Sequence, residues 1–329
     1  MKSAIKWALF IVVLIFVGWS LANQFKQIDW GALHFRPSAI ALAGMCLLLV
    51  PLLQLISYRT LLGAYAHAPP MRVMMAVAWV PPLGKYVPGK IASLAGAVYL
   101  LRKFQIPAAI ALSVVLAMDG LAVMSGLIVG APLLKVFVPN GTIPAAAIIV
   151  IGIVCLHPAV FARLLNFVLR KLNRPQLDHV PDLKHYLVPV MCAFGQWVLA
   201  GFALWLITAS VAEVRTESIL RFISIAGLGY TISYLALFAP GGLGPRELIF
   251  QQAMQHSVVP AAMSAVAVVV MRIVQTLTEL SAAGVGVMVL RRLEAEQGLT
   301  SPTSAIPDAS QNVPRGLHPG SSDAPSKSA

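Results

Sequence analysis

The chain has 329 residues, of which 58% are hydrophobic and only 11% are charged, against about 25% charged residues in a typical soluble domain. These charged residues are too few to cover the surface of a soluble protein of this length. The composition therefore excludes a soluble fold. The net charge of +12 does not indicate a nucleic-acid-binding protein, because the basic residues stand mostly at the ends of apolar segments, where they set membrane orientation.

Six apolar segments are each predicted to cross the membrane as a helix, since about 20 apolar residues span the hydrocarbon core. The first, residues 7–22, follows two lysines and is expected to be retained rather than cleaved as a signal peptide. The others are residues 38–56, residues 106–130, residues 143–156 continuing as a helix into 157–169, residues 186–210 and residues 261–290.

Two further apolar segments, residues 73–101 and 220–259, are interrupted in the middle. The interruptions are Pro81-Pro82-Leu83-Gly84-Lys85-Tyr86-Val87-Pro88-Gly89-Lys90 and Pro240-Gly241-Gly242-Leu243-Gly244-Pro245-Arg246-Glu247. No straight helix survives so many prolines and glycines. We therefore predict two re-entrant hairpins, each of which enters and leaves the membrane on one side.

The end of the chain differs from the rest. Beyond residue 296 the composition shifts to Ser, Pro, Gly and Asn with almost no large apolar side chains, and such a segment cannot bury a core. We therefore expect a transmembrane domain over residues 1–292 and a disordered cytoplasmic tail over residues 293–329.

The basic residues predict the orientation of these elements. With the N-terminus in the cytoplasm, thirteen Lys and Arg residues flank the spans on the cytoplasmic side and five on the outer side, which is a clear positive-inside bias. If each interrupted segment crossed once, Arg102 and Lys103 would move outside and weaken the bias. We therefore predict an all-α polytopic helical bundle of six spans and two hairpins, with both termini in the cytoplasm.

The order of the predicted elements repeats with opposite orientation in the membrane. Asp119 lies 31 residues after Pro88, and Arg272 lies 32 residues after Pro240, so each half carries a charged residue in the span after its hairpin. Inverted repeats with Gly- and Pro-broken segments in matching positions are typical of alternating-access transporters, whose site lies where the breaks meet. Such breaks also kink ordinary spans, but two in corresponding places, each with charges, favour a functional site.

The charges near the breaks predict a site for an anion. The N–H groups exposed at the start of a half-helix favour negative charge, and an ionisable side chain at membrane depth costs at least about 2.5–3.5 kcal/mol by insertion scales, so those that remain are functional candidates. The predicted substrate-binding residues are Lys85, Pro88, Gly89, Lys90, Asp119, Gly241, Gly242, Gly244, Arg246, Glu247, Arg272 and Glu279.

The pairing of these charges stays open at this point. Asp119 can pair with a hairpin lysine, and Glu247 or Glu279 with an arginine. Arg272, Gln275 and Glu279 fall at i, i+3 and i+7, which is one face of a helix. That polar stripe fits a binding site and fits polar contacts between packed helices about equally well.

The sequence offers little for an enzyme. Its three cysteines and seven histidines show no metal-ligand spacing, and it contains no P-loop, no GxSxG and no Asp-x-Asp motif. We therefore expect no metal, no cofactor and no enzymatic activity, and transport that does not use ATP.

The two hairpin motifs, 84–90 and above all 240–247, resemble the signatures of the flippase-like transmembrane region of the lysylphosphatidylglycerol synthase family. The resemblance covers about residues 5–292 and implies translocation of a lipid between leaflets. It does not imply lysyl transfer, because no aminoacyltransferase domain follows Arg292.

The first motif departs from that family where many members carry Gly-Glu and a later Arg, since this chain has Gly89-Lys90 and Ala97. In the second motif Pro245 replaces a small aliphatic residue. The added lysine makes the site more positive, which fits an anionic headgroup, such as a phospholipid or a polyprenyl-phosphate-linked sugar, better than a cationic lysyl-lipid.

The sequence thus predicts a multi-pass protein of a bacterial inner membrane that moves a lipid or lipid-linked saccharide, with no nucleic-acid partner and no particular oligomeric state. Two alternatives stay open: an ion-coupled transporter of a small anionic solute, and a membrane enzyme acting on a lipid phosphate. A lateral opening toward lipid favours the flippase, whereas a closed polar cavity favours the solute transporter.

Overall fold

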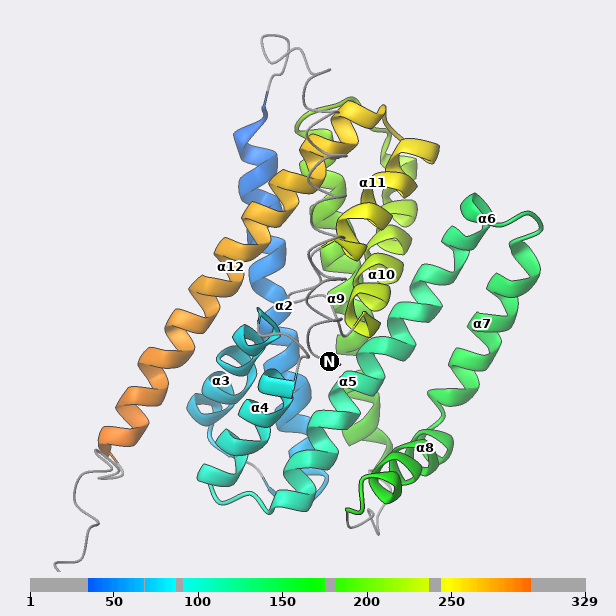
Figure 1. The fold of residues 1–329 in the computed structure, drawn as a ribbon. Coiled ribbons are helices and arrows are strands. Elements are labelled where there is room, and N and C mark those ends of the chain that lie inside the picture. Colours follow the sequence, from blue (N-terminus) through cyan, green and yellow to red (C-terminus); the bar gives the residue numbers. More distant parts are fainter. Residues whose placement is uncertain (1–34, 68, 87–90, 175–181, 237–243, 297–329) are drawn as a thin grey trace, which may run out of the picture. The chain divides into compact units, whose positions relative to one another are not determined.

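The computed structural model describes residues 35–67, 69–86, 91–174, 182–236 and 244–296, and in them the backbone forms α-helices and short 3-10 helices without any strand (Figure 1). The predicted all-α fold is therefore confirmed for this part of the chain. The first predicted span at 7–22 and residues 297–329 of the predicted tail lie outside it.

The described elements form two consecutive groups of four α-helices joined by a connecting segment. The first group is α2 (Pro37–Gly63), α3 (Met71–Trp79), the 3-10 helix η1 (Pro81–Tyr86), α4 (Ile91–Lys103) and α5 (Ala108–Gly130). The connecting segment is η2 (Ala131–Leu133), α6 (Leu134–Phe137), α7 (Thr142–Cys155) and α8 (Pro158–Lys171). The second group is α9 (Leu183–Ala209), η3 (Thr216–Ser218), α10 (Ile219–Leu235), α11 (Pro245–Ser257) and α12 (Ala261–Glu296).

Several of these helices can cross a bilayer. By length and composition, five helical stretches of the described residues can do so, and six if α7 and α8 count as one bent span. The five are Pro37–Gly63, Ala108–Phe137, His185–Ala209, Thr216–Leu235 and Ala261–Glu296. The predicted spans at 38–56, 106–130, 186–210 and 261–290 are therefore confirmed as α2, α5, α9 and α12.

The first predicted hairpin is formed by α3, η1 and α4. The α-helices α3 and α4 have 9 and 13 residues, or about 14 and 20 Å at 1.5 Å per residue. Neither can therefore cross a hydrocarbon core of about 30 Å. They pack against each other in the lower half of Figure 1. The indole Nε1 of Trp79 donates to the carbonyl of Pro51 at 3.0 Å, which ties the hairpin to α2.

The second hairpin is formed by α10 and α11, which pack side by side in the upper half of Figure 1. With η3, α10 is long enough to pass as a span, but α11 has only 13 residues and runs back toward the end from which α10 entered. The order α2–α3–α4–α5 is thus repeated upside down by α9–α10–α11–α12, as the sequence predicts.

One prediction about the connecting segment is wrong. The sequence suggested that the fifth span continues as one helix from 143 into 169, whereas α7 and α8 meet at 85°. The break lies at His157, whose ψ of 130° is extended, because a residue before proline avoids the helical region. Pro158 then starts α8 at its first position, where its missing N–H costs nothing.

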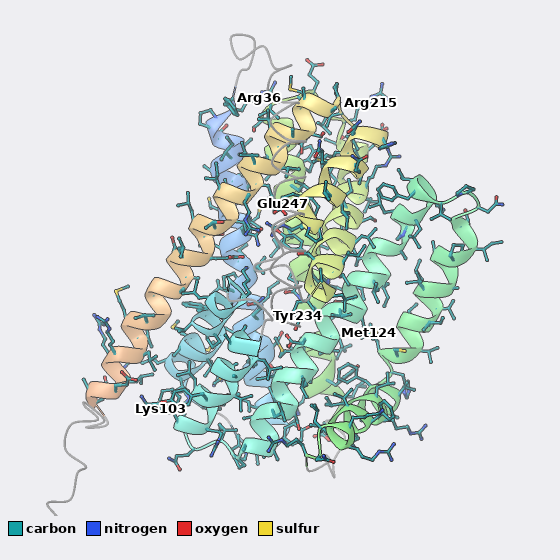
Figure 2. All side chains as sticks on the ribbon, in the orientation of Figure 1. Arg36, Lys103, Met124, Arg215, Tyr234 and Glu247 are labelled. Carbon is teal, nitrogen blue, oxygen red and sulfur yellow. The ribbon has the colours of Figure 1, made fainter. Side chains whose placement is uncertain are left out.

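Each hairpin lies in its own apolar core. One core joins the C-terminal part of α2 to α3, α4, α5 and α8, around Leu62, Met74 and Leu101. The other joins the N-terminal part of α2 to α9, α10, α11 and α12, around Ile207 and Phe250. Basic side chains mark the ends of the bundle: Figure 2 shows Arg36 and Arg215 at one end and Lys103 at the other, as the predicted topology requires.

Candidate functional site

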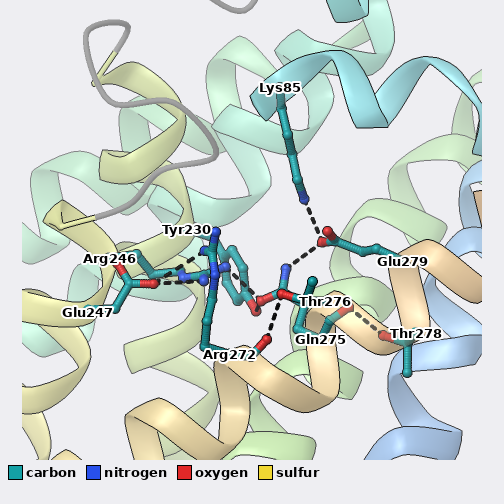
Figure 3. A network of polar contacts seen from close by, with 9 residues as sticks. All are labelled: Lys85, Tyr230, Arg246, Glu247, Arg272, Gln275, Thr276, Thr278 and Glu279. Atoms are coloured by element: carbon teal, nitrogen blue, oxygen red, sulfur yellow. Dashed lines mark hydrogen bonds and ion pairs between the residues drawn. The ribbon is translucent and has the colours of Figure 1, made fainter. Parts of the chain in front are cut away.

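A continuous network of polar side chains connects the two hairpins (Figure 3). Its members come from η1 at the turn of the first hairpin, from α10 and α11 of the second, and from α12. We call it the polar cluster; its principal residues are Lys85, Tyr230, Arg246, Glu247, Arg272, Gln275 and Glu279. Arg272, Gln275 and Glu279 do share one face of α12, as predicted.

Glu247 is the most fully paired carboxylate of the cluster. Arg246 Nη2 donates to its Oε1 at 2.8 Å, and Arg272 Nη1 donates to the same oxygen at 3.3 Å. The other oxygen, Oε2, accepts the backbone N–H of Gly244 at 2.8 Å. Glu247 is 6% exposed, so its single negative charge is shared by two guanidinium groups in a nearly dry environment.

The local backbone explains why Glu247 is held there. Gly244 has φ 97°, a conformation that costs other residues energy but not glycine, and Pro245 begins α11 at its first position. Glu247 is the third residue of the helix, where a carboxylate reaches back to cap the helix start. Its negative charge is also stabilised by the positive end of the helix dipole.

Arg246 lies deepest in the cluster, at 4% exposure. Its Nη1 donates to Gln275 Oε1 at 2.6 Å, and its guanidinium carbon lies 4.9 Å from the ring centre of Tyr230 and 6.0 Å from that of Phe250. Tyr230 Oη donates to the same amide oxygen at 2.7 Å. Aromatic faces stabilise a desolvated cation, so this arginine is fixed on three sides.

Lys85 and Glu279 form the accessible end of the cluster. Lys85 Nζ contacts Glu279 Oε1 at 2.5 Å, and their side chains are 28% and 24% exposed, compared with 5% for Arg246. Gln275 Nε2 donates to the same Glu279 oxygen at 2.7 Å. Gln275 therefore links the Lys85–Glu279 pair to Arg246.

The cluster is positively charged when all its groups are ionised. It contains three cations, Lys85, Arg246 and Arg272, and two carboxylates, Glu247 and Glu279, which leaves an excess of one positive charge. Figure 2 places Glu247 between the two ends of the bundle. A positive cluster between the membrane surfaces is suited to bind an anion.

Asp119 belongs to a second polar group. Its carboxyl, on α5, hydrogen-bonds to the phenol of Tyr234 on α10, and Tyr58 on α2 lies close enough to sense its charge. The predicted pairing of Asp119 with a hairpin lysine stays a prediction; Lys85, one of the two hairpin lysines, contacts Glu279. Lys90, the other lysine of that hairpin, lies outside the described residues.

The predicted site residues divide into three sets. The structure brings together Lys85, Gly244, Arg246, Glu247, Arg272 and Glu279. Asp119 contributes to the second polar group instead. Outside the described residues lie Pro88, Gly89, Lys90, Gly241 and Gly242.

Sequence reasoning missed the tyrosines. Tyr230 joins the polar cluster and Tyr234 joins Asp119, one helical turn apart on α10. A tyrosine in an apolar helix carries a mainly apolar ring with one polar tip, so its residue type alone does not separate packing from binding. The signal that could have found them is their spacing of four residues just before the second break.

Nothing in the described ranges suits a metal ion, since no group of three His, Cys, Asp or Glu side chains gathers there. The family model for the lysylphosphatidylglycerol synthase TM region matches residues 3–282, which includes both hairpins and the whole polar cluster. No curated protein matches the chain.

Proposed function

The chain belongs to the family of lysylphosphatidylglycerol synthase transmembrane regions, and from that premise we propose that it translocates a lipid or lipid-linked saccharide with an anionic headgroup between the leaflets of a bacterial inner membrane. In this proposal it is a transporter and not an enzyme. The observation that carries the proposal is the polar cluster, which connects the ends of two oppositely oriented hairpins.

The chemistry of the cluster supports an anionic headgroup. Arginine guanidinium groups bind phosphate through paired N–H donors, and lysine binds it as a point charge. Arg246 and Arg272 lie beside the start of α11, and Lys85 faces them across Glu279 and Gln275. A phosphodiester monoanion also matches the excess of one positive charge.

The helix that carries Glu279 also has an exposed apolar face. Ile273, Leu277 and Leu280 of α12 are 54%, 59% and 51% exposed, and they lie on a different face of the helix from Arg272, Gln275 and Glu279. Such a face suits contact with the bilayer, so the acyl chains of a lipid bound at the cluster would stay in an apolar environment beside α12.

The proposal is tested with the full chain in liposomes that contain acyl-labelled phosphatidylglycerol. A membrane-impermeant quencher reports how fast the label changes leaflet, and labelled phosphatidylcholine serves as the zwitterionic comparison. We expect faster movement of phosphatidylglycerol than in protein-free vesicles. Because each variant removes a charged hydrogen-bond partner, worth about 1.5–3 kcal/mol, Lys85→Ala and Arg246→Ala should slow it by about tenfold or more.

Lys135→Ala is the matched control, since Lys135 is an exposed lysine on α6, away from the cluster. It should keep the wild-type rate. If no anionic lipid moves faster than in empty vesicles, the proposed function is wrong. If phosphatidylglycerol moves and both cluster variants keep the wild-type rate, the site assignment is wrong.

A further inference from the structure

Glu247 and Glu279 are held very differently within the one cluster. Glu247 accepts from two arginines and a backbone N–H and is almost fully buried. Glu279 contacts Lys85 and the neutral amide of Gln275, at the accessible end of the network. Only the second carboxylate is therefore placed where both an incoming headgroup and a proton can reach it.

A headgroup anion that binds to Lys85 competes directly with Glu279. The ammonium is a compact point charge, and Glu279 Oε1 already contacts it at 2.5 Å. A phosphate oxygen that takes this position puts two anions on one cation. The amide of Gln275 can still donate to Glu279, but it brings no counter-charge.

The exchange favours the protonated form of Glu279, because a nearby cation favours the ionised form of a carboxyl and a nearby anion disfavours it. The protonated oxygen is also a donor. Once neutral, Glu279 can donate a hydrogen bond to the same phosphate that Lys85 binds. Glu279 then no longer competes with the headgroup for Lys85 but helps to bind it.

The charges around Glu279 come from every element that the cluster contains. Lys85 faces it from η1, Arg246 from α11 and Tyr230 from α10. Glu247, beside Arg246 on α11, pairs with that arginine. Arg272 and Gln275 share its own helix. The arginines are held by Glu247 and Gln275, so Lys85 is the cation that the headgroup can take from Glu279.

We propose that Glu279 is the proton-binding residue of a proton-coupled lipid transporter, and that it takes up one proton for each monoanionic headgroup bound. This rests on the proposed function of the cluster as the headgroup site. The loaded site then carries the same charge as the empty one, because the added proton offsets the added anion. In a complete cycle the anion and the proton cross together and the site returns empty, so no net charge crosses the membrane and transport responds to a pH gradient, not to membrane voltage.

Binding is tested first, because it does not depend on transport. The purified full chain in weakly buffered detergent solution is titrated with dihexanoyl phosphatidylglycerol, and a pH-indicator dye reports proton uptake while calorimetry reports binding. We expect uptake of about one proton per lipid bound at neutral pH. Glu279→Gln should bind the lipid without proton uptake, and Glu217→Gln, a change at an exposed acid on η3, should keep it.

The same titration with glycerol phosphate and with inorganic phosphate distinguishes a lipid headgroup from a free phosphate. If either soluble anion binds and takes up protons as well as the lipid does, the site recognises phosphate alone. Glu279→Asp keeps a carboxyl and should retain uptake, which covers the case in which the Gln variant fails to fold.

Transport supplies the second readout. In liposomes with an imposed pH gradient, the wild type should accumulate labelled phosphatidylglycerol in one leaflet, whereas Glu279→Gln should only equilibrate it. Lipid binding without proton uptake, or uptake that persists in Glu279→Gln, overturns the proton role and leaves the proposed function standing. Absence of both lipid binding and lipid movement overturns the proposed function, and the proton role with it.

Discussion

Glu247 on α11 and Glu279 on α12 are 32 positions apart in the sequence and are joined by hydrogen bonds through Arg246 and Gln275. Their residue type alone does not distinguish their roles. Glu247 stabilises the start of α11, the buried Arg246 and the partly buried Arg272. Glu279 forms an ion pair with Lys85 at the turn of the first hairpin. The first contact set is mainly structural, and the second is the one that a ligand can rearrange.

This difference predicts different effects on stability. Glu247→Ala leaves the buried guanidinium of Arg246 without its carboxylate, and breaking a buried pair costs about 3–5 kcal/mol. Glu279→Ala removes a partly exposed pair and should cost clearly less. Thermal unfolding of the purified variants measures this, with Glu217→Ala as the control at an exposed acid; equal losses at Glu247 and Glu279 would contradict the assignment.

At the scale of the elements, α5 and α10 come into close contact at glycine residues. A Cβ on Gly130 would lie 2.6 Å from the backbone nitrogen of Leu228, and one on Gly227 would lie 3.0 Å from the carbonyl oxygen of Gly126. Small residues let two membrane helices come into backbone contact. This contact positions α10, and with it Tyr230 and Tyr234, against the rest of the bundle.

The close approach predicts that Gly130→Ala is destabilising. Inserting a methyl group into a packed contact costs about 1–3 kcal/mol, and here the neighbour is backbone, which cannot move aside cheaply. Gly284 on α12 is the matched control, since its added Cβ would meet nothing within 4 Å. Gly284→Ala should be neutral or stabilising, because alanine favours a helix; a comparable loss of unfolding temperature in both variants would refute the packing argument.

How far the sequence predicts these elements depends on whether local chemistry decides them. The long spans follow from apolar length. The hairpins follow from clusters of prolines and glycines, whereas the single Pro51 and Pro189 are tolerated inside α2 and α9. The turn between α7 and α8 was not predicted, because the long apolar run was given more weight than the extended conformation that Pro158 imposes on His157. The partners of Asp119 and Arg246 were not predictable, since they depend on which helices pack together.

At the scale of the whole molecule, the arrangement of the halves predicts which residues face the cytoplasm. Lys103 ends α4 and lies at the opposite end of the bundle from Arg36 and Arg215 (Figure 2). In a background without Cys46, Cys155 and Cys192, a cysteine introduced at position 103 should react only with a reagent on the cytoplasmic side. Asn140→Cys, in the exposed turn before α7, should react only from outside; labelling of position 103 from outside would show that the first hairpin crosses the membrane.

The last helix connects these scales. α12 is a single helix of 36 residues, about 54 Å long at 1.5 Å per residue, and its sequence contains no proline. Its first part packs into the core of the second hairpin through Ala267 and Met271, and Gly286 near its other end lies against Trp79 and Val80 of the first. A rigid rod that touches both hairpins cannot move at one of them alone. We therefore expect the two hairpins to move together, with the polar cluster carried on the part of α12 between them.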